Sequence, residues 1–238
     1  MRPTDELDLT LRPAEPQDAT ALADLYSAAR VAAVPMMPPA RHTNAEDRVW
    51  FAAQLVAPGR EAWVAERGGE TVGYALLHDD WLDHLFIRPD VVGQGVGSAL
   101  LDLVKSLRPG GFCLWVFESN QGARRFYLRH GLVHLERTDG AGNEELAPDL
   151  RMAWPGADPL TFYRGLIDDV DEQLGDLLAR RAALTAAVQR HKSEQTRDPD
   201  RERAIAVAMS RRAPALGPDR LARIVHTIIT ESLDAADS

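Results

Sequence analysis

The stretch that decides the fold of the N-terminal half is Leu82-Asp-His-Leu-Phe-Ile-Arg-Pro89, followed by Val92-Gly-Gln-Gly-Val-Gly97. The first part is an extended apolar run that ends at a proline, and the second is dense in glycine and opens a run with helical spacing. The pattern predicts a strand, a glycine turn and a helix. Because the first N–H groups of a helix lack acceptors and lie at the positive end of its dipole, such a turn can bind phosphate oxygens.

Spacing separates three kinds of phosphate-binding turn. A P-loop ends in Gly-Lys-Ser/Thr, whereas Gly97 is followed by Ser98 and Ala99. A dinucleotide-binding turn has GxGxxG directly after its strand and an acid farther on. Glu118 mimics that acid, but residues 89–92 intervene and the glycines have the wrong period. Coenzyme A remains, with its pyrophosphate on the turn and its pantetheine arm along the strand.

The following segment narrows the choice of family. Leu114-Trp-Val-Phe-Glu118 has a strand pattern, and residues 119–131 read as a short helix with an Asn or Ser N-cap and a glycine stop. Over about residues 8–154 the sequence closely resembles the GNAT superfamily of N-acetyltransferases, through the strand-proline-glycine turn, Asn120 with Phe126-Tyr127, and Gly131-Leu132. The resemblance implies an α+β fold, in which helices flank a mixed central sheet, and acetyl-CoA as the cofactor.

The resemblance also implies roles for individual residues. Tyr127 would protonate the departing thiolate, and Asn120 would contact the pantetheine arm, so both are expected catalytic residues. Val92 stands where the family usually has Arg or Gln, so one side-chain contact to the cofactor is missing and its affinity is expected to be reduced. The implied cofactor-binding residues are Leu85, Phe86 and Ile87 along the arm, Val92, Gly93, Gln94, Gly95, Val96, Gly97 and Ser98 at the pyrophosphate, together with Asn120 and Tyr127.

The acetyl acceptor is expected to be a small-molecule amine. An alkyl ammonium has a pKa of about 10 and must lose a proton before it attacks. Asp83, His84 and Glu118 are the candidate bases, and one error in strand register would turn any of them away. The acceptor region is placed at residues 31–50, where a proline-rich run precedes a helix start at Thr43 or Asn44.

A second domain follows a linker rich in proline and glycine. We predict domain boundaries at 1–154, 155–159 for the linker and 160–238. Three helices are expected in the last part: one to about His191, one after Asp198-Pro199 and one from Gly217-Pro218. Thirty helical residues span about 45 Å. Two short helices cannot cover an apolar stripe of that length, so a homodimer, in which a second copy covers the rest, is expected. The apolar stripe of the long helix is Leu160, Tyr163, Ile167, Val170, Leu174, Leu177, Leu184 and Val188.

Two cations interrupt this stripe. Arg181 and Lys192 are eleven residues apart, which brings their side chains within about 20° of each other around a helix. A bound anion would compensate them, and pairing with Glu202 or Asp198 or snorkelling at the edge of the stripe would also do so. Only two of the 27 cationic residues are lysines, so a compact ammonium is favoured at position 192.

Residues 160–236 closely resemble the all-helical chorismate mutase family. The matching site residues are Arg164, Arg181, Lys192, Asp198, Arg201, Glu202 and Ser232. The resemblance implies rearrangement of chorismate to prephenate without a cofactor, with Lys192 and Arg181 catalytic and Arg164 reaching into the partner's site. Ala236 stands where the family has Gln or Glu, a loss that costs about 10²–10³ in rate. The domain is therefore expected to be a weak mutase, a lyase or mutase for a related substrate such as isochorismate, or a binding and dimerisation module that senses aromatic-pathway metabolites.

Composition sets the remaining expectations. No apolar run is long enough for a signal peptide or a membrane span, and the single Cys113 excludes internal disulfides and suits a reducing cytoplasm. The net charge of −9 disfavours nucleic acid and mildly favours cationic acceptors. No metal site is expected. We predict a bifunctional acetyltransferase and chorismate mutase; the alternatives are an acetyltransferase with a catalytically weak sensing domain and a protein that only binds ligands.

Overall fold

The structure is a computed structural model that describes residues 9–191 and 198–236. The chain forms two compact units, Met1–Tyr163 and Arg164–Ser238. No helix in the described part of the chain is both long and apolar enough to cross a membrane.

The first unit is built on a mixed seven-stranded sheet with the order β1-β2-β3-β4-β5-β7-β6. Neighbouring strands are antiparallel except for β4 and β5, which run parallel. This is the α+β architecture that the sequence predicts. The strands are β1 (Thr10–Pro13), β2 (Arg60–Arg67), β3 (Glu70–His78), β4 (Trp81–Ile87), β5 (Phe112–Phe117), β6 (Val133–Arg137) and β7 (Asp149–Trp154).

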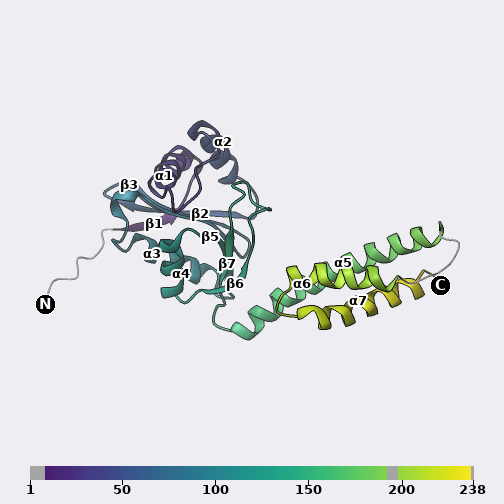
Figure 1. Ribbon diagram of the computed structural model, residues 1–238. Helices are drawn as coiled ribbons and strands as arrows, with labels where there is room; N and C mark the ends of the chain where they lie inside the picture. Colours follow the sequence, from purple (N-terminus) through teal and green to yellow (C-terminus); the bar gives the residue numbers. More distant parts are fainter. Residues whose placement is uncertain (1–8, 192–197, 237–238) are drawn as a thin grey trace. The chain divides into compact units, whose positions relative to one another are not determined.

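Helices cover both faces of this sheet. Figure 1 shows α1 (Ala19–Ala32) and α2 (Asn44–Gln54) on one face and α3 (Val96–Leu107) and α4 (Gln121–Arg129) on the other. Each face has its own apolar cluster, because strand side chains alternate between the two faces. Leu100 and Tyr127 lie in the cluster beneath α3 and α4, and Leu22 and Phe51 lie in the cluster beneath α1 and α2.

The predicted helix starts in this unit agree with the structure. Thr43 caps α2, since its side chain accepts a hydrogen bond from the N–H of Glu46 and the Glu46 carboxylate accepts one from the N–H of Thr43. Asn120 caps α4 through the N–H of Ala123, at 3.1 Å. These side chains satisfy N–H groups that a helix leaves without acceptors at its beginning.

The feature that positions the candidate site is the divergence of β4 from β5. The two strands share a single register pair, Trp81 with Cys113, while the other edge of β5 is paired with β7. On its other side β4 stays paired with β3 as far as Ile87. Residues 85–87 therefore form an edge of β4 with no strand beside it on the β5 side, which we call the open edge.

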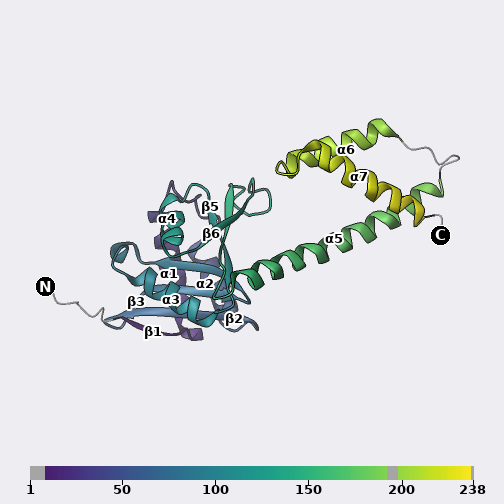
Figure 2. The same ribbon diagram turned by 90° about the horizontal axis from the view of Figure 1, so that it is seen from below.

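The second unit is helical. It contains most of α5 (Pro159–Gln189), together with α6 (Pro199–Arg212) and α7 (Gly217–Asp234), and Asp198 caps α6 as predicted. In Figure 2, α6 and α7 lie side by side, whereas the first half of α5 diverges from them. No residue of α5 is buried, and Ile167, Leu177 and Leu184 are each about 60% exposed. The predicted stripe is thus uncovered within one chain.

Gly73 on β3 supports the turn between β4 and α3. A Cβ atom at this position would lie 2.9 Å from Ile87 Cδ1, 3.0 Å from Val96 Cγ1 and 3.1 Å from Leu100 Cδ1. We predict that Gly73→Val forces α3 away from the sheet and lowers the free energy of unfolding by about 1–3 kcal/mol, the usual cost of overpacking.

Urea unfolding followed by tryptophan fluorescence would measure this change, because all five tryptophans lie in the first unit. Gly110→Ala is the matched control, since a Cβ atom at Gly110 meets nothing within 4 Å. Equal stability of Gly73→Val and the wild type would show that the packing of α3 is not tight at this point.

Candidate functional sites

The predicted phosphate-binding turn, residues 92–98, leads into the start of α3 and is called the cradle here, although the N–H groups of Val92 and Gln94 already donate to the carbonyl oxygens of Pro89 and Val91. Gly93 and Gly95 have φ values of 84° and 87°, which favour glycine. Gly95 is the N-cap of α3 and has no side chain that could cap the helix. The first N–H groups of α3 therefore remain available to an anion. The Val92 side chain is 65% exposed and adds no polar group to the cradle.

The open edge lies next to Tyr127 in the same apolar cluster. Tyr127 is buried in this cluster, and Leu85 and Ile87 pack against it, whereas Phe86 belongs to the cluster on the opposite face. Burial raises the pKa of Tyr127 above its ordinary value of 10. The phenol is consequently protonated at neutral pH, as a proton donor must be.

Asn120 lies at the beginning of α4. Its side-chain oxygen is used as the helix cap, and its amide nitrogen has no hydrogen-bond partner among the described residues. Within the same turn, Arg124 Nη1 donates to the carbonyl oxygen of Glu118 at 2.8 Å. The capping bond fixes the side chain and leaves the NH₂ group as a donor.

The three candidate bases have different environments. Asp83 occupies a bulge in β4 and pairs with Arg60, yet burial outweighs this pair and raises its pKa. Glu118 is held by both nitrogens of the Arg137 fork, at 2.9 and 2.7 Å, which lowers its pKa. His84 lies on the face that α1 and α2 cover, where Leu76 is its partner on β3.

An aromatic cluster encloses His84. Its ring stacks between Tyr26, at 5.3 Å, and Trp50, at 5.2 Å, and its Nδ1 lies 3.0 Å from the hydroxyl of the fully buried Tyr74. Desolvation, with smaller contributions from Arg30 and Arg60, lowers the pKa of His84 to about 3. The imidazole is therefore neutral at physiological pH and holds a bound proton too weakly to act as an ordinary general base.

A buried arginine, Arg30, holds the predicted acceptor region through hydrogen bonds that could not be inferred from the sequence. Arg30 is 4% exposed and donates to the carbonyl oxygens of Pro38, at 3.1 Å, and Pro39, at 3.4 Å, and to Glu145 at 2.9 Å. Ser119 adds a bond to the Met36 carbonyl at 2.7 Å. Arg30 and Glu145 are 115 positions apart, so no local signal could have paired them.

Arg67 is a second residue that sequence reasoning missed. It lies at the end of β2, and its Nη1 donates to the side-chain oxygen of Gln94 in the cradle at 2.7 Å. The other terminal nitrogen of Arg67 is buried without a hydrogen-bond partner. Nothing in the two sequence segments indicates this contact, because it depends on how β2 is placed beside the turn.

In the helical unit the structure brings together two of the predicted site residues, Arg181 and Ser232. Arg181 Nη1 donates to Ser232 Oγ at 2.5 Å and to the Ile228 carbonyl at 3.2 Å. Ser232 is 6% exposed and donates in turn to Ile228 at 2.6 Å. Arg181 thus bonds to neutral oxygens here rather than to Glu202 or Asp198.

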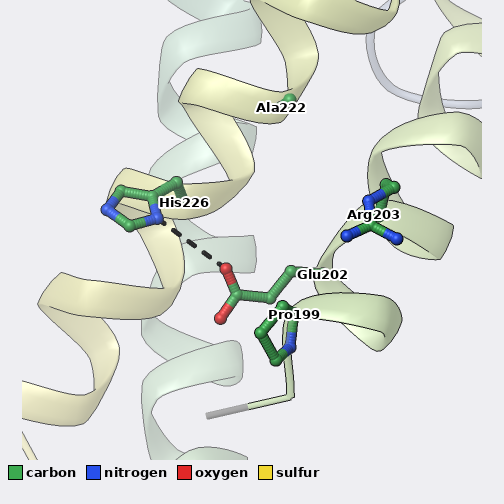
Figure 3. A pocket seen from close by; sticks show the side chains of 5 residues that line it. All are labelled: Pro199, Glu202, Arg203, Ala222 and His226. Carbon is green, nitrogen blue, oxygen red and sulfur yellow. Dashed lines mark ion pairs between the residues drawn. The ribbon is translucent and has the colours of Figure 1, made fainter.

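A small pocket of about 230 Å³ contains another predicted site residue, Glu202. Figure 3 shows the Glu202 carboxylate facing His226 across the space between α6 and α7, with His226 Nδ1 3.7 Å from its oxygen. The sequence analysis did not select His226. The pocket is lined by Pro199, Glu202, Arg203, Ala222 and His226.

No side-chain hydrogen bond or ion pair joins the other predicted residues that the structure describes to the side chains of Arg181 or Glu202. Arg164 and Arg201 are exposed, and Asp198 is engaged as a helix cap through the N–H of Arg201 at 2.9 Å. Lys192 lies outside the described residues. Ala236 follows the last turn of α7, where its N–H donates to the Leu233 carbonyl.

Family models match both parts of the chain. One described as an acetyltransferase (GNAT) domain matches residues 58–133. Another, described as chorismate mutase type II, matches residues 163–236. The order of the two domains is the one that the sequence analysis predicts.

Curated relatives match the N-terminal part. The chain is 35% identical over 99 residues to peptidyl-lysine N-acetyltransferase YjaB of Salmonella typhimurium, a match that covers 41% of this chain and 68% of that protein. It is 33% identical over 95 residues to peptidyl-lysine N-acetyltransferase YiaC of Escherichia coli, covering 39% and 62% of the two chains.

Solved structures share the fold of the same part. Apo YjaB from Escherichia coli aligns with a TM-score of 0.52 and 27% identity, over 63% of this chain and 99% of that one. A GCN5-related N-acetyltransferase from Rhodopseudomonas palustris aligns with a TM-score of 0.50 and 26% identity, over 61% and 94%.

The enclosed His84 makes stability depend on pH in a specific direction. Its folded-state pKa of about 3 lies below its ordinary value of 6.5. Below pH 6.5 the unfolded chain binds a proton at this position that the folded chain excludes. The contribution of neutral His84 is therefore complete above that pH and falls as pH approaches 3, by up to about 1.4 kcal/mol per pH unit.

We predict that His84→Gln flattens the pH dependence of the free energy of unfolding between about pH 4 and pH 7. Urea titrations followed by tryptophan fluorescence at several pH values would measure the slope for both proteins. All other acid-sensitive groups remain in both, so the difference isolates His84. Parallel curves would mean that the ring is protonated in the folded protein.

Proposed function

We propose that this chain, which belongs to the GNAT acetyltransferase family in its N-terminal unit and carries a chorismate mutase type II domain after it, is a bifunctional enzyme. Its first activity is acetyl-CoA-dependent acetylation of an amine, and its second is the conversion of chorismate to prephenate. The observation that carries the first is the open edge of β4, with the cradle at one end and Tyr127 packed beside it.

Each part of this arrangement has a role in acetyl transfer. Acetyl-CoA supplies the acetyl group as a thioester. The N–H groups of residues 92–98 bind its pyrophosphate, and those of the open edge hydrogen-bond the pantetheine arm and stabilise the negative charge on the carbonyl oxygen during attack. As the amine nitrogen forms its bond to the carbonyl carbon and the C–S bond breaks, the Tyr127 hydroxyl donates a proton to the sulfur. The Asn120 NH₂ group is a donor for the arm.

The acceptor is a primary amine. Relatives at 33–35% identity are named peptidyl-lysine N-acetyltransferases, which favours a lysine side chain; the small-molecule amine expected from the sequence is the alternative acceptor. The net charge of −9 favours a cationic acceptor of either kind. Acetylation of lysine-containing peptides and of free polyamines, measured in parallel by thiol release, distinguishes the two.

The second activity rests on the cations of the helical unit. Arg181 is held by Ser232, and its remaining donors suit one carboxylate of chorismate. Lys192 stabilises charge that develops on the ether oxygen, Glu202 and Ser232 bind the ring hydroxyl side, and Arg201 and the capping Asp198 border the site. This function is supported by the family match over residues 163–236 and by these residue identities.

A homodimer completes this site. The apolar face of α5, with Ile167, Leu177 and Leu184 about 60% exposed, is covered by a second copy of the same helix region. Burying apolar surface of this kind yields roughly 25 cal/mol per Å². Arg164, which is exposed and seventeen residues before Arg181, then reaches the partner's site. The single buried cysteine, Cys113, agrees with a cytoplasmic location for the dimer.

A second candidate function follows from Ala236. Because the family's amide or carboxyl side chain is missing at this position, the helical domain is alternatively a weak catalyst that dimerises the acetyltransferase and binds a regulatory carboxylate. Chorismate would then change the rate of acetyl transfer without itself being consumed.

Tyr127→Phe tests the first activity. Loss of the phenolic proton should lower kcat about 10²-fold, while the dissociation constant of coenzyme A, measured by calorimetry, changes little. Tyr163→Phe, at the junction of the two units, is the control and should leave kcat unchanged. An unaltered kcat in Tyr127→Phe would remove this residue from proton transfer.

Mixing two inactive variants tests the second activity and the dimer together. We expect Arg164→Ala and Arg181→Ala homodimers to lose prephenate formation. Co-expressed chains should regain about a quarter of wild-type activity, since half the dimers are mixed and each has one intact site. Sedimentation analysis would check that every sample is dimeric.

The outcomes separate the two candidate functions. No recovery in mixed dimers would mean that Arg164 serves its own chain or none. A wild-type dimer with no mutase activity would favour the sensing domain, and Ala236→Gln should then raise chorismate turnover by restoring the missing donor. Activity of Ala236→Gln no higher than that of the wild type would show that the pocket serves another ligand.

A further inference from the structure

We propose that Arg67 supplies the cationic contact to the phosphate groups of coenzyme A that Val92 leaves out of the cradle. The inference rests on the acetyl-CoA binding proposed above, and it adds a residue from a different strand to that site. Val92 is apolar and 65% exposed, so the position itself offers a phosphate no hydrogen-bond donor.

Arg67 lies at the end of β2 and contacts the cradle through its side chain. Strand β2 ends at Arg67, immediately before a two-glycine turn into β3. From there its Nη1 donates to the Gln94 side-chain oxygen at 2.7 Å, and Gln94 Nε2 donates to the Asp90 carbonyl at 3.2 Å. Gln94 lies between Gly93 and Gly95, so the guanidinium adjoins the N–H groups that precede α3.

The charge of Arg67 is available, unlike that of the neighbouring Arg88. Arg88 is held by two carboxylates, with Nε 2.7 Å from Asp90 and Nη1 2.9 Å from Glu70. Arg67 forms no ion pair with any described residue and donates its one hydrogen bond to the neutral amide of Gln94, although the Asp90 carboxylate, which Arg88 holds, is close enough to interact with its charge. Arg88 is therefore largely neutralised, and Arg67 still attracts an anion.

An unsatisfied donor points to the same ligand chemistry. Nη2 of Arg67 is buried and has no acceptor, an arrangement that costs free energy until an acceptor arrives. A phosphate that replaces the Gln94 oxygen can accept from both terminal nitrogens at once, in the two-pronged geometry that arginine forms with phosphate. The dipole of α3 adds favourable potential at the same place.

Calorimetric binding of three ligands to the full-length protein tests the proposal. Coenzyme A carries the pyrophosphate and the 3′-phosphate, 3′-dephospho-coenzyme A retains only the pyrophosphate, and pantetheine has neither. Arg67→Gln should weaken coenzyme A binding about tenfold, as expected for one charge-assisted hydrogen-bond pair, and leave pantetheine binding unchanged. Loss with both nucleotides assigns the contact to the pyrophosphate, and loss with coenzyme A alone assigns it to the 3′-phosphate.

Two further variants make the result specific. Arg48→Gln removes one positive charge from an exposed arginine on α2, which pairs with Asp24 on the other face of the sheet, and should not alter binding. Val92→Arg in the Arg67→Gln background should restore the affinity, because it returns a cation to the cradle from the turn itself. Arg67→Gln should also show a weaker salt dependence of binding than the wild type.

The possible failures are distinguishable. The proposal is overturned if the wild type binds coenzyme A and folded Arg67→Gln binds it with an affinity within about twofold of the wild type. A change that small is less than one charged hydrogen bond contributes, so Arg67 would have no role in binding. If the wild type binds neither nucleotide, the acetyl-CoA function itself fails and this inference fails with it. Circular dichroism of each variant would establish that it is folded.

Discussion

The divergence of β4 from β5 is the constraint on which the first site depends. A strand whose outer edge is fully paired has no N–H groups to offer a ligand, but β4 and β5 meet only at Trp81 and Cys113. On its other edge β5 pairs with β7 along its whole length, and β4 remains paired with β3 on the side away from β5. The sheet thus stays continuous while residues 85–87 have no strand beside them on the β5 side, and Tyr127 lies in the apolar cluster against which Leu85 and Ile87 pack.

In the helical unit the main constraint is the exposed apolar surface of α5, which no other helix of the same chain covers. A helix of 31 residues presents one long stripe, and α6 and α7 pack mainly on each other. Burial within one chain is consequently small, with Leu221, Val225 and Ala206 the buried apolar residues described there. The homodimer proposed above would cover this exposed apolar surface and complete the proposed second site at the same time.

Arginines without carboxylate partners recur where the two proposed sites require an anion. Arg181 bonds to a hydroxyl and a carbonyl oxygen, and Arg67 bonds to an amide. Neither guanidinium is hydrogen-bonded to a carboxylate among the described residues. Arg30, by contrast, is paired with Glu145 and serves the architecture of the loop at residues 33–41. The partners of a buried arginine thus separate binding roles from structural ones.

Both families, the order of the domains, the glycine turn before α3 and the helix caps at Thr43, Asn120 and Asp198 were predictable from the sequence alone. These features are encoded locally, because glycine φ angles, capping side chains and apolar periodicity act within a few residues of one another. Only the tertiary structure decided that Arg67 meets Gln94, that Arg30 meets Glu145 and that aromatic rings enclose His84. Such contacts join segments far apart in the chain, and they depend on strand order and register, which no local pattern specifies.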